Sequence, residues 1–282
     1  MKYITTTDLT LIEALALLSP ESSKTTLRSW LKDGRVTVDG ELVKHTQELV
    51  RQGQEVALGN RPRYIRGGIR MLYEDRHIAV IEKPAGLLSV ATAFEIEETA
   101  HGILKDHFGA HRVFVVHRLD QDTSGVMMFA LTETARDVLK ETFEKHDIER
   151  AYTAIVEGCL KQHSGTWESY LYEDEAYMVH STPDSEKGRL AITHFEVHAS
   201  NRRYTSLLLK LETGRKNQIR VHCQDAGHPV VGDKKYGATS NPLKRLCLHA
   251  HLLAFNHPIT KQKMRFESTM PDNFNRLASR GK

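Results

Sequence analysis

A short polar segment between two apolar runs carries the residues best suited to chemistry. VHRLDQDTSG at 116–125 places His117, Arg118, Asp120 and Asp122 within six positions. The flanking runs are typical of buried strands, so the segment predicts a polar loop held against a core. A carboxylate in such a loop is desolvated, and it stays ionised only beside a cation or several donors. An ionised aspartate beside an arginine suits a nucleophile or a general base.

Two arginines could supply that cation, since arginine is always charged and binds carboxylates bidentately. Arg118 is close to Asp120 in sequence, and Arg220 lies in a second polar segment that enters a helical pattern. The alternative is that Asp120 and Asp122 only cap turns, which is common for aspartate.

Other segments combine residue types that turns and cores also use. They are EKPAGLLSV at 82–90, IERAYTAIVEG at 148–158, LETGRKNQIRVHCQDAGHPVVGDKKYG at 211–237 and RLCLHAHLLAFNHP at 245–258. His249 and His251 would share one face of a strand, but neither an HExxH pattern nor a third ligand at a known spacing accompanies them. We therefore expect no metal site.

The elements that must position these residues follow from apolar periodicity. Strands are predicted at 71–82, 112–117, 126–131, 150–157, 190–199 and 204–213, and helices at 97–108, 132–146 and 216–226. No regular βαβ repeat is visible. The pattern predicts an α+β fold over 70–282, with a mixed, mostly antiparallel sheet and a central cleft. A sparse segment rich in Gly and Arg, 59–69, is predicted to be a linker.

The first 58 residues predict a small separate domain. Two helical patterns precede a hairpin with Asp39-Gly40 at its turn. Four basic residues fall on one face along and just past the second helix: Lys24, Arg28, Lys32 and Arg35. A solvated helix surface would show the same spacing. The order of elements, however, resembles the small α/β RNA-binding domain first described in ribosomal protein S four, which implies an RNA-facing helix.

Composition sets broad limits on the class of protein. The chain has 282 residues, of which 40% are hydrophobic and 27% charged, with a net charge of +3. A core of useful size is therefore possible, and global charge alone does not mark a nucleic-acid binder. The three cysteines are far apart, and the first residues lack an apolar signal core. We expect a monomeric, cytoplasmic protein without membrane contact.

Taken together, the polar segments resemble the motifs of the RluA-type pseudouridine synthases, in order, over about 71–270. The matching stretches are KPAGL at 83–87, HRLDQDTSG at 117–125, RAYTAIVEG at 150–158, TGRKNQIRVH at 213–222, GHPVVGDKKYG at 227–237 and RLCLHAHLLAF at 245–255. One position departs, because Asn217 stands where the family usually has a histidine. Asn217 can donate a hydrogen bond but does not titrate.

The resemblance implies an isomerase that converts uridine in structured RNA to pseudouridine without a cofactor. It implies that Asp120 is the catalyst, that Arg220 is its ion-pair partner and that Tyr152 stacks on the target uracil. It further implies that Arg118 fills the space of the flipped nucleotide and that Leu248 packs under the base. Arg215 and Lys216 belong to a basic stretch, 212–245, that is expected to contact RNA phosphates.

The resemblance leaves the substrate open. The S-four-like domain favours large-subunit ribosomal RNA, and transfer RNA is the alternative within the same reaction. A non-catalytic RNA-binding protein of ribosome assembly would keep the same fold, and a metal-dependent hydrolase using the histidines is a second rival. Asp120 could attack the sugar, attack the base or remove a sugar proton, and each role requires the ionised form.

Overall fold

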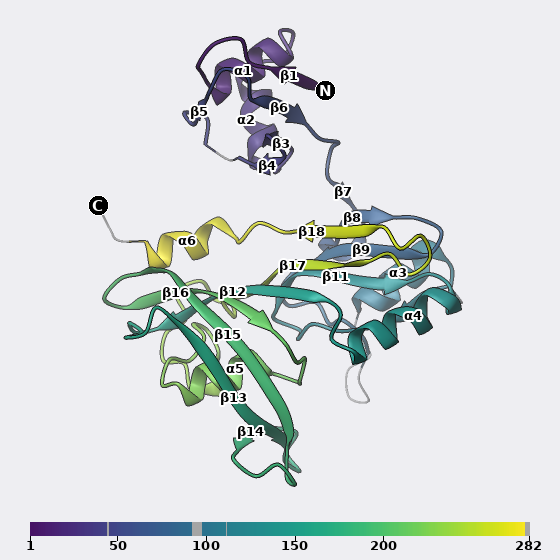
Figure 1. Cartoon of the computed structure of the whole chain (residues 1–282), viewed down its shortest axis with the longest axis vertical. Helices are drawn as coiled ribbons and strands as arrows, with labels where there is room; N and C mark the ends of the chain where they lie inside the picture. Colours follow the sequence, from purple (N-terminus) through teal and green to yellow (C-terminus); the bar gives the residue numbers. More distant parts are fainter. Residues whose placement is uncertain (44, 92–97, 111, 280–282) are drawn as a thin grey trace. The chain divides into compact units, whose positions relative to one another are not determined.

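The computed structural model describes residues 1–43, 45–91, 98–110 and 112–279, which fall into two compact units (Figure 1). The units are Met1–Arg63 and Tyr64–Lys282. Their division falls inside the predicted linker 59–69. The longest helix of the described residues has 12 residues, and no helix in this part of the chain is long and apolar enough to cross a membrane.

The first unit packs two helices on a small antiparallel sheet. Helix α1 (Leu11–Leu18) and helix α2 (Lys24–Lys32) are connected through Ser19 and Pro20. The sheet has the order β1 (Lys2–Ile4), β6 (Glu55–Leu58), β3 (Val36–Val38), β4 (Glu41–Leu42), and β2 (Leu9–Thr10) pairs with β5 (Leu49–Val50). Helix α2 begins at Ser23, whose hydroxyl accepts from the Thr26 amide at 3.2 Å. Leu15, Leu27 and Leu31 are fully or almost fully buried between helices and sheet.

The second unit is built on one long sheet, which confirms the α+β class and the mostly antiparallel arrangement. Twelve strands of the described residues belong to it. Their order is β14 (Val179–Thr182), β13 (Ser164–Glu173), β15 (Arg189–Ser200), β16 (Tyr204–Leu211), β12 (Glu149–Glu157), β17 (Leu248–Asn256), β11 (Ser124–Ala130), β9 (Ile78–Lys83), β8 (Arg70–Glu74) and β7 (Arg63–Tyr64), with β10 (Phe114–Val115) on β11 and β18 (Lys263–Glu267) on β17.

A narrow parallel contact between β11 and β17 joins the two halves of this sheet. Only Ser124 and Gly125 pair there, with His249 and Ala250. Gly125 has φ +121°, and a Cβ at this position would overlap the backbone of Ala250. The join therefore requires glycine at the second residue of β11, two positions after the polar loop ends.

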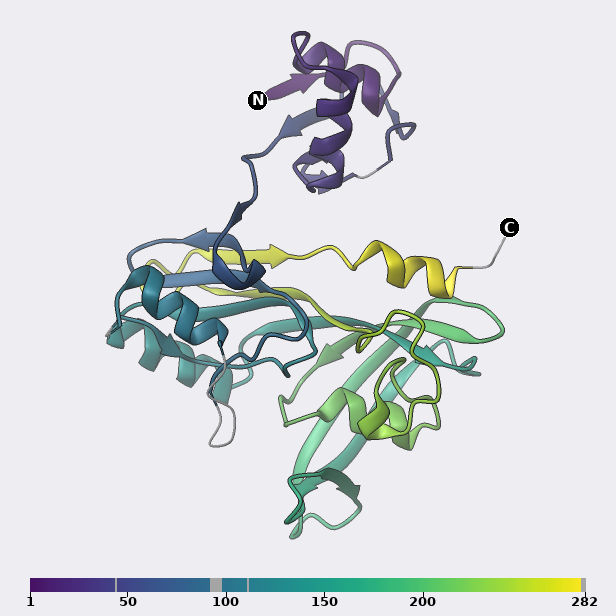
Figure 2. The same cartoon turned by 180° about the vertical axis from the view of Figure 1, so that it is seen from behind.

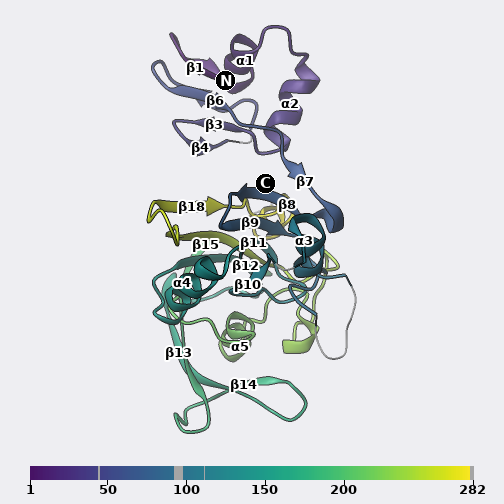
Figure 3. The same ribbon diagram turned by 90° about the vertical axis from the view of Figure 1, so that its right-hand side faces the viewer.

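Helices α3 (Ala100–Phe108) and α4 (Glu133–Glu144) cover opposite faces of β9 and β11 (Figure 3). Alternation along the strands explains the two layers. Ile81 and Phe129 point to the side of α3, whereas Val80 and Met128 point to the side of α4. All four are fully buried, so the strands are apolar on both faces.

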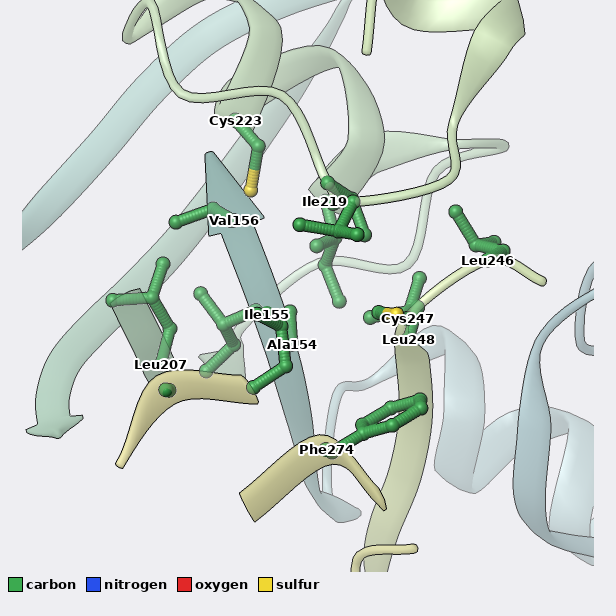
Figure 4. Close-up of a cluster of buried hydrophobic side chains, with 14 of the residues drawn as sticks. Ala154, Ile155, Val156, Leu207, Ile219, Cys223, Leu246, Cys247, Leu248 and Phe274 are labelled. Carbon is green, nitrogen blue, oxygen red and sulfur yellow. The ribbon is translucent and has the colours of Figure 1, made fainter. Parts of the chain in front are cut away.

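The other half of the sheet carries helix α5 (Gln218–Asp225) and helix α6 (Asp272–Ala278) (Figure 2). Figure 4 shows Ile219 and Cys223 of α5 among apolar side chains of β12, and Phe274 of α6 beside Cys247 and Leu248. This core fixes α5, and with it the polar residues at the start of that helix.

The strand predictions fail at one place and are incomplete at others. The single strand predicted at 71–82 is wrong: β8 and β9 are separated by a turn in which the Asp75 carboxylate accepts from the His77 and Ile78 amides. The helix predicted at 97–108 begins at Ala100, and residue 97 lies outside the described residues. Strands β13, β14 and β18 and helix α6 were not predicted, because their burial alternates or they are short. Strand β17, which has nine residues and is mostly buried, was not predicted either.

Candidate active site

Asp120 lies in the loop between β10 and β11, and this loop is fastened to residues 83–89. Lys83 is fully buried, and its ammonium donates to the carbonyl oxygens of Pro84 at 2.9 Å, Leu87 at 2.6 Å and Gln121 at 2.8 Å. Three acceptors match the three N–H bonds of a lysine. Burial lowers the pKa of Lys83 to about 7, although the charges of Asp122 and Asp120 oppose the shift.

Ser89 holds the loop on the other side of the aspartate. Its hydroxyl donates to the Leu119 carbonyl at 2.6 Å and accepts from the Leu119 amide at 3.1 Å. Asp120 is therefore flanked by two residues whose backbone is fixed, Leu119 and Gln121.

Arg220 faces Asp120 from the first turns of α5. Its Nη1 atom lies 3.3 Å from Asp120 Oδ2, while its Nε and Nη2 atoms contact Asp233 at 2.6 and 2.8 Å. The Asp233 side chain is only 1% exposed. Although burial opposes the charge, the hydrogen bonds and charge of Asp233, and then Asp120, raise the pKa of Arg220. Arg220 thus presents a permanent positive charge to Asp120.

The segment before α5 is ordered by side-chain hydrogen bonds. Asn217 is the N-cap and has φ 53°, a left-handed conformation that asparagine tolerates. Its side chain accepts from Arg220 Nη1 at 3.2 Å and donates to the Tyr236 hydroxyl at 2.9 Å. The Tyr236 ring lies under the Arg220 guanidinium at 4.8 Å. The unusual Asn217 therefore takes part in holding Arg220.

Asp120, Tyr152, Arg220 and Leu248 line one pocket with a volume of about 490 Å³. Tyr152 lies on β12. Leu248 lies on the neighbouring strand β17 and is buried at the floor of the pocket. Burial raises the pKa of Tyr152, Arg150 opposes this shift, and the Asp120 charge adds to it. Tyr152 is thus a neutral, half-buried ring beside the carboxylate.

His117 lines the same pocket, but its ring is used for contacts within the fold. Its Nε2 atom accepts from the Met128 amide at 2.9 Å, and its ring stacks on Phe143 at 4.7 Å. Burial, and then the charge of Arg150, lower the pKa of His117 to about 3. A histidine that stays neutral and uses its free nitrogen as an acceptor fixes β11 rather than transferring protons.

The predicted RNA-binding residues differ in how free they are. Arg118 is exposed at the pocket. Arg215 donates from Nε to the Leu190 carbonyl at 2.9 Å, and Lys216 pairs with Glu173. In the first unit Lys24, Arg28 and Lys32 are exposed, whereas Arg35 donates to the Gly59 and Asn60 carbonyls and stacks on Trp30.

The histidines of β17 bond to the protein. His249 Nδ1 lies 2.9 Å from the Ser124 hydroxyl, and His251 Nδ1 lies 2.8 Å from the Ser268 carbonyl. Both histidines lie on the same side of β17, and there they make hydrogen bonds within the fold.

Sequence reasoning missed several residues that support the site. Asp233 appeared only as one acid in a basic stretch, and Lys83 and Ser89 only within a motif. Arg150 was seen only as part of a motif around Tyr152, although it also lines the pocket. Their roles depend on carbonyl positions and on contacts between residues 13 to 62 positions apart, from Asp233 with Arg220 to Arg150 with Glu212, which motif spacing does not give.

Known proteins of one family match both the sequence and the fold of this chain. The family model described as RNA pseudouridylate synthase matches residues 77–225. An uncharacterized RNA pseudouridine synthase of Bacillus subtilis is 35% identical over 91% of this chain and 88% of its own. Ribosomal large subunit pseudouridine synthase D of Pseudomonas aeruginosa is 34% identical over 92% of this chain and 88% of its own. The solved structure of human RNA pseudouridylate synthase domain containing 1 matches with a TM-score of 0.61 and 25% identity, over 72% of this chain and 84% of that chain.

Proposed function

This chain belongs to the RNA pseudouridylate synthase family, and we propose from that premise that it modifies large-subunit ribosomal RNA, with Asp120 as its catalytic residue. Membership of the family, with its RluA-type relatives, makes it an isomerase that acts on uridine in RNA. The observation that carries the residue assignment is the pocket in which Asp120 stands between the Arg220 cation and the Tyr152 ring.

The reaction is an intramolecular exchange of bonds at the ribose. The bond from the anomeric carbon to uracil N1 breaks, the uracil turns, and a bond from the same carbon to C5 forms. The hydrogen on C5 then leaves as a proton while N1 gains one, so atoms and electrons balance without a redox partner. The chain must hold the detached uracil and supply one ionised group beside the ribose.

The residues of the pocket can be assigned to these tasks. Asp120 acts on the sugar or on the base in its ionised form, and Arg220 sets the electrostatic field around it. The Tyr152 ring stacks on the uracil, which is worth about 1–3 kcal/mol per base, and its hydroxyl is assigned to the removal of the C5 proton. Leu248 forms the apolar floor under the base, and Arg118 fills the space that the extruded nucleotide leaves in the RNA.

The choice of ribosomal RNA is supported by two features. The relative from Pseudomonas aeruginosa, whose name gives the ribosomal large subunit, covers nearly the same length of chain. The first unit exposes Lys24, Arg28 and Lys32 along one helix, as a phosphate-contacting surface would. We propose that this unit is an S-four-like RNA-binding domain within residues 1–58. The monomeric state and cytoplasmic location stay predictions.

Pseudouridine mapping tests the proposal. Ribosomal and transfer RNA from cells with and without the gene would be treated with carbodiimide and read by primer extension. We expect loss of a signal in large-subunit ribosomal RNA, restored by the wild-type gene but not by Asp120→Ala. A lost signal in transfer RNA instead would refute the substrate. Restoration by Asp120→Ala would refute the catalytic assignment and favour a non-catalytic role.

A further inference from the structure

Arg150 is a half-buried cation whose charge has no acidic partner among the described residues. It comes from β12 and lines the pocket that holds Asp120 and Tyr152. Within the part of the chain that the structure describes, its Nε atom is buried without a hydrogen-bond partner, and its Nη2 atom reaches only the Glu212 carbonyl, at 3.4 Å. Burial lowers its pKa. Leaving a charge and a donor buried in this way is costly unless a ligand completes them.

Three acids around Arg150 have other partners. The Glu212 carboxylate bonds to His194 Nε2 at 2.6 Å, and Glu149 pairs with Arg265 at 3.5 Å. Asp120 faces Arg220, as described above. Of the residues lining the pocket, four are arginines and only Asp120 and Glu144 are acids. The wall around Arg150 is therefore positive before any ligand enters.

The guanidinium of Arg150 fits between the end of α4 and the turn before α5. Its carbon lies 5.8 Å from the centre of the Phe143 ring at the end of α4. On the other side is Gly214, where a Cβ would overlap Arg150 Nη1. Any other residue at 214 would displace the arginine, so the turn before α5 and the end of α4 together hold it in the pocket wall.

We propose that Arg150 binds the phosphate of the nucleotide whose base enters the pocket. This inference rests on the proposed function, in which the uracil stacks on Tyr152. Residues 150 and 152 point to the same face of β12, with Cα atoms about 7 Å apart. A nucleotide with its base on Tyr152 thus extends its phosphate toward Arg150 across the ribose. A phosphate offers the planar fork of an arginine two oxygens and satisfies both its charge and the empty Nε donor.

A nucleotide-binding measurement distinguishes phosphate binding by Arg150 from a purely structural role. Uridine 5′-monophosphate and uridine would be titrated into the wild type, Arg150→Met and the control Arg276→Met, which removes an exposed arginine of α6. A charge-assisted contact predicts that wild type and control bind the monophosphate about tenfold more tightly than the nucleoside. Arg150→Met should bind the two equally. Because this ratio is taken within each protein, a general loss of stability does not produce it.

Turnover on RNA distinguishes failure of the inference from failure of the proposed function. A wild type that binds both compounds equally, or an Arg150→Met variant that keeps the preference, overturns the phosphate assignment even if RNA is modified. A wild type that prefers the monophosphate but forms no pseudouridine in total cellular RNA supports the assignment and overturns the proposed function. In an active enzyme, Arg150→Lys should keep part of the preference, because it retains the charge but not the fork.

Discussion

Arg220 is held more closely by Asp233 than by Asp120. Two nitrogens of the guanidinium contact the buried Asp233 at 2.6 and 2.8 Å, and the third reaches Asp120 at 3.3 Å. The arginine is thus anchored by one carboxylate and offers its remaining donor to the other. An anchored cation keeps its place whatever Asp120 does during the reaction, which is the kind of preorganisation that favours catalysis.

Replacing Asp233 should damage stability and activity together. Asp233→Asn leaves the buried Arg220 charge without its main partner, and loss of one member of such a pair costs about 3 kcal/mol in the free energy of unfolding. Urea denaturation would measure this, with Asp225→Asn, at an exposed position of the helix that carries Arg220, as control. If both variants unfold at the same urea concentration, Asp233 is not the anchor.

Replacing Asp120 should leave the fold intact and remove the reaction. Asp120→Asn keeps the size of the side chain, but it loses the charge that acts on the substrate, so turnover should fall by about 10³-fold or more. Release of tritium from RNA labelled at uracil C5 measures the reaction directly, because that hydrogen leaves in every turnover. Asp122→Asn is the matched control in the same loop. Comparable activity in both variants would contradict the assignment.

Tyr152 should contribute separately through its ring and its hydroxyl. Tyr152→Phe keeps the stacking surface, so RNA affinity should be unchanged while turnover falls. Tyr152→Ala should also weaken RNA binding, by about 1–3 kcal/mol. Filter binding and tritium release on the same RNA separate the two effects. Full turnover in the phenylalanine variant would show that the hydroxyl takes no part.

Lys83 should make stability depend on pH above neutrality. Its folded pKa is about 7 because of burial, whereas in the unfolded chain it is near 10.4. Between these values the unfolded state holds the extra proton, so stability rises with pH. The wild type should therefore gain about 1.4 kcal/mol per pH unit over Lys83→Met between pH 7 and 10.

Denaturation midpoints of the two proteins at pH 6, 7, 8 and 9 would test the Lys83 prediction. Below pH 7 both states of the wild type carry the proton, and the difference between the proteins should be constant. Parallel curves at every pH would mean that the three carbonyls keep Lys83 charged throughout.

The exposed face of α2 should contribute salt-dependent RNA affinity. Replacing Lys24, Arg28 and Lys32 by Gln removes up to three phosphate contacts, and each lowers the slope of log K against log salt by about 0.7–0.9. Fluorescence titration of ribosomal RNA fragments at several salt concentrations measures the slope. Lys2→Gln is the control, because Lys2 pairs with Glu55 in the same unit. An unchanged slope would exclude this face as an RNA contact.

Much of the fold was open to sequence reasoning where periodicity was strong. The continuous apolar run at 126–131 and the helical pattern at 132–146 correspond to β11 and α4. It failed where a side chain bends the backbone, as Asp75 does between β8 and β9. It also passed over β13, where exposed and half-buried residues alternate without a strong apolar signal.

The chemistry of the candidate site was predictable from the sequence, but the residues that hold the site in place were not. Asp120 and Arg220 are 100 residues apart; the residues alone left Arg118 and Arg220 as candidate partners, and the family motifs favoured Arg220, which lies 3.3 Å from Asp120. Lys83 bonds to backbone carbonyls, which every residue carries, so its three partners leave no mark in the sequence. Likewise, the unbonded Nε donor of Arg150 depends on which atoms surround it in the folded chain, and the sequence does not give this.

The join at Gly125 also decides where this chain can change its length. The loop of Asp120 runs straight into the two residue pairs that connect β11 with β17. An insertion between Asp120 and Gly125 would shift that register and move the glycine away from Ala250, so both halves of the sheet would lose their junction. Strands β13 and β14 lie at the far edge of the same sheet. A change of length at that edge would leave the junction in place, whereas a change of length in the stretch around the aspartate would not.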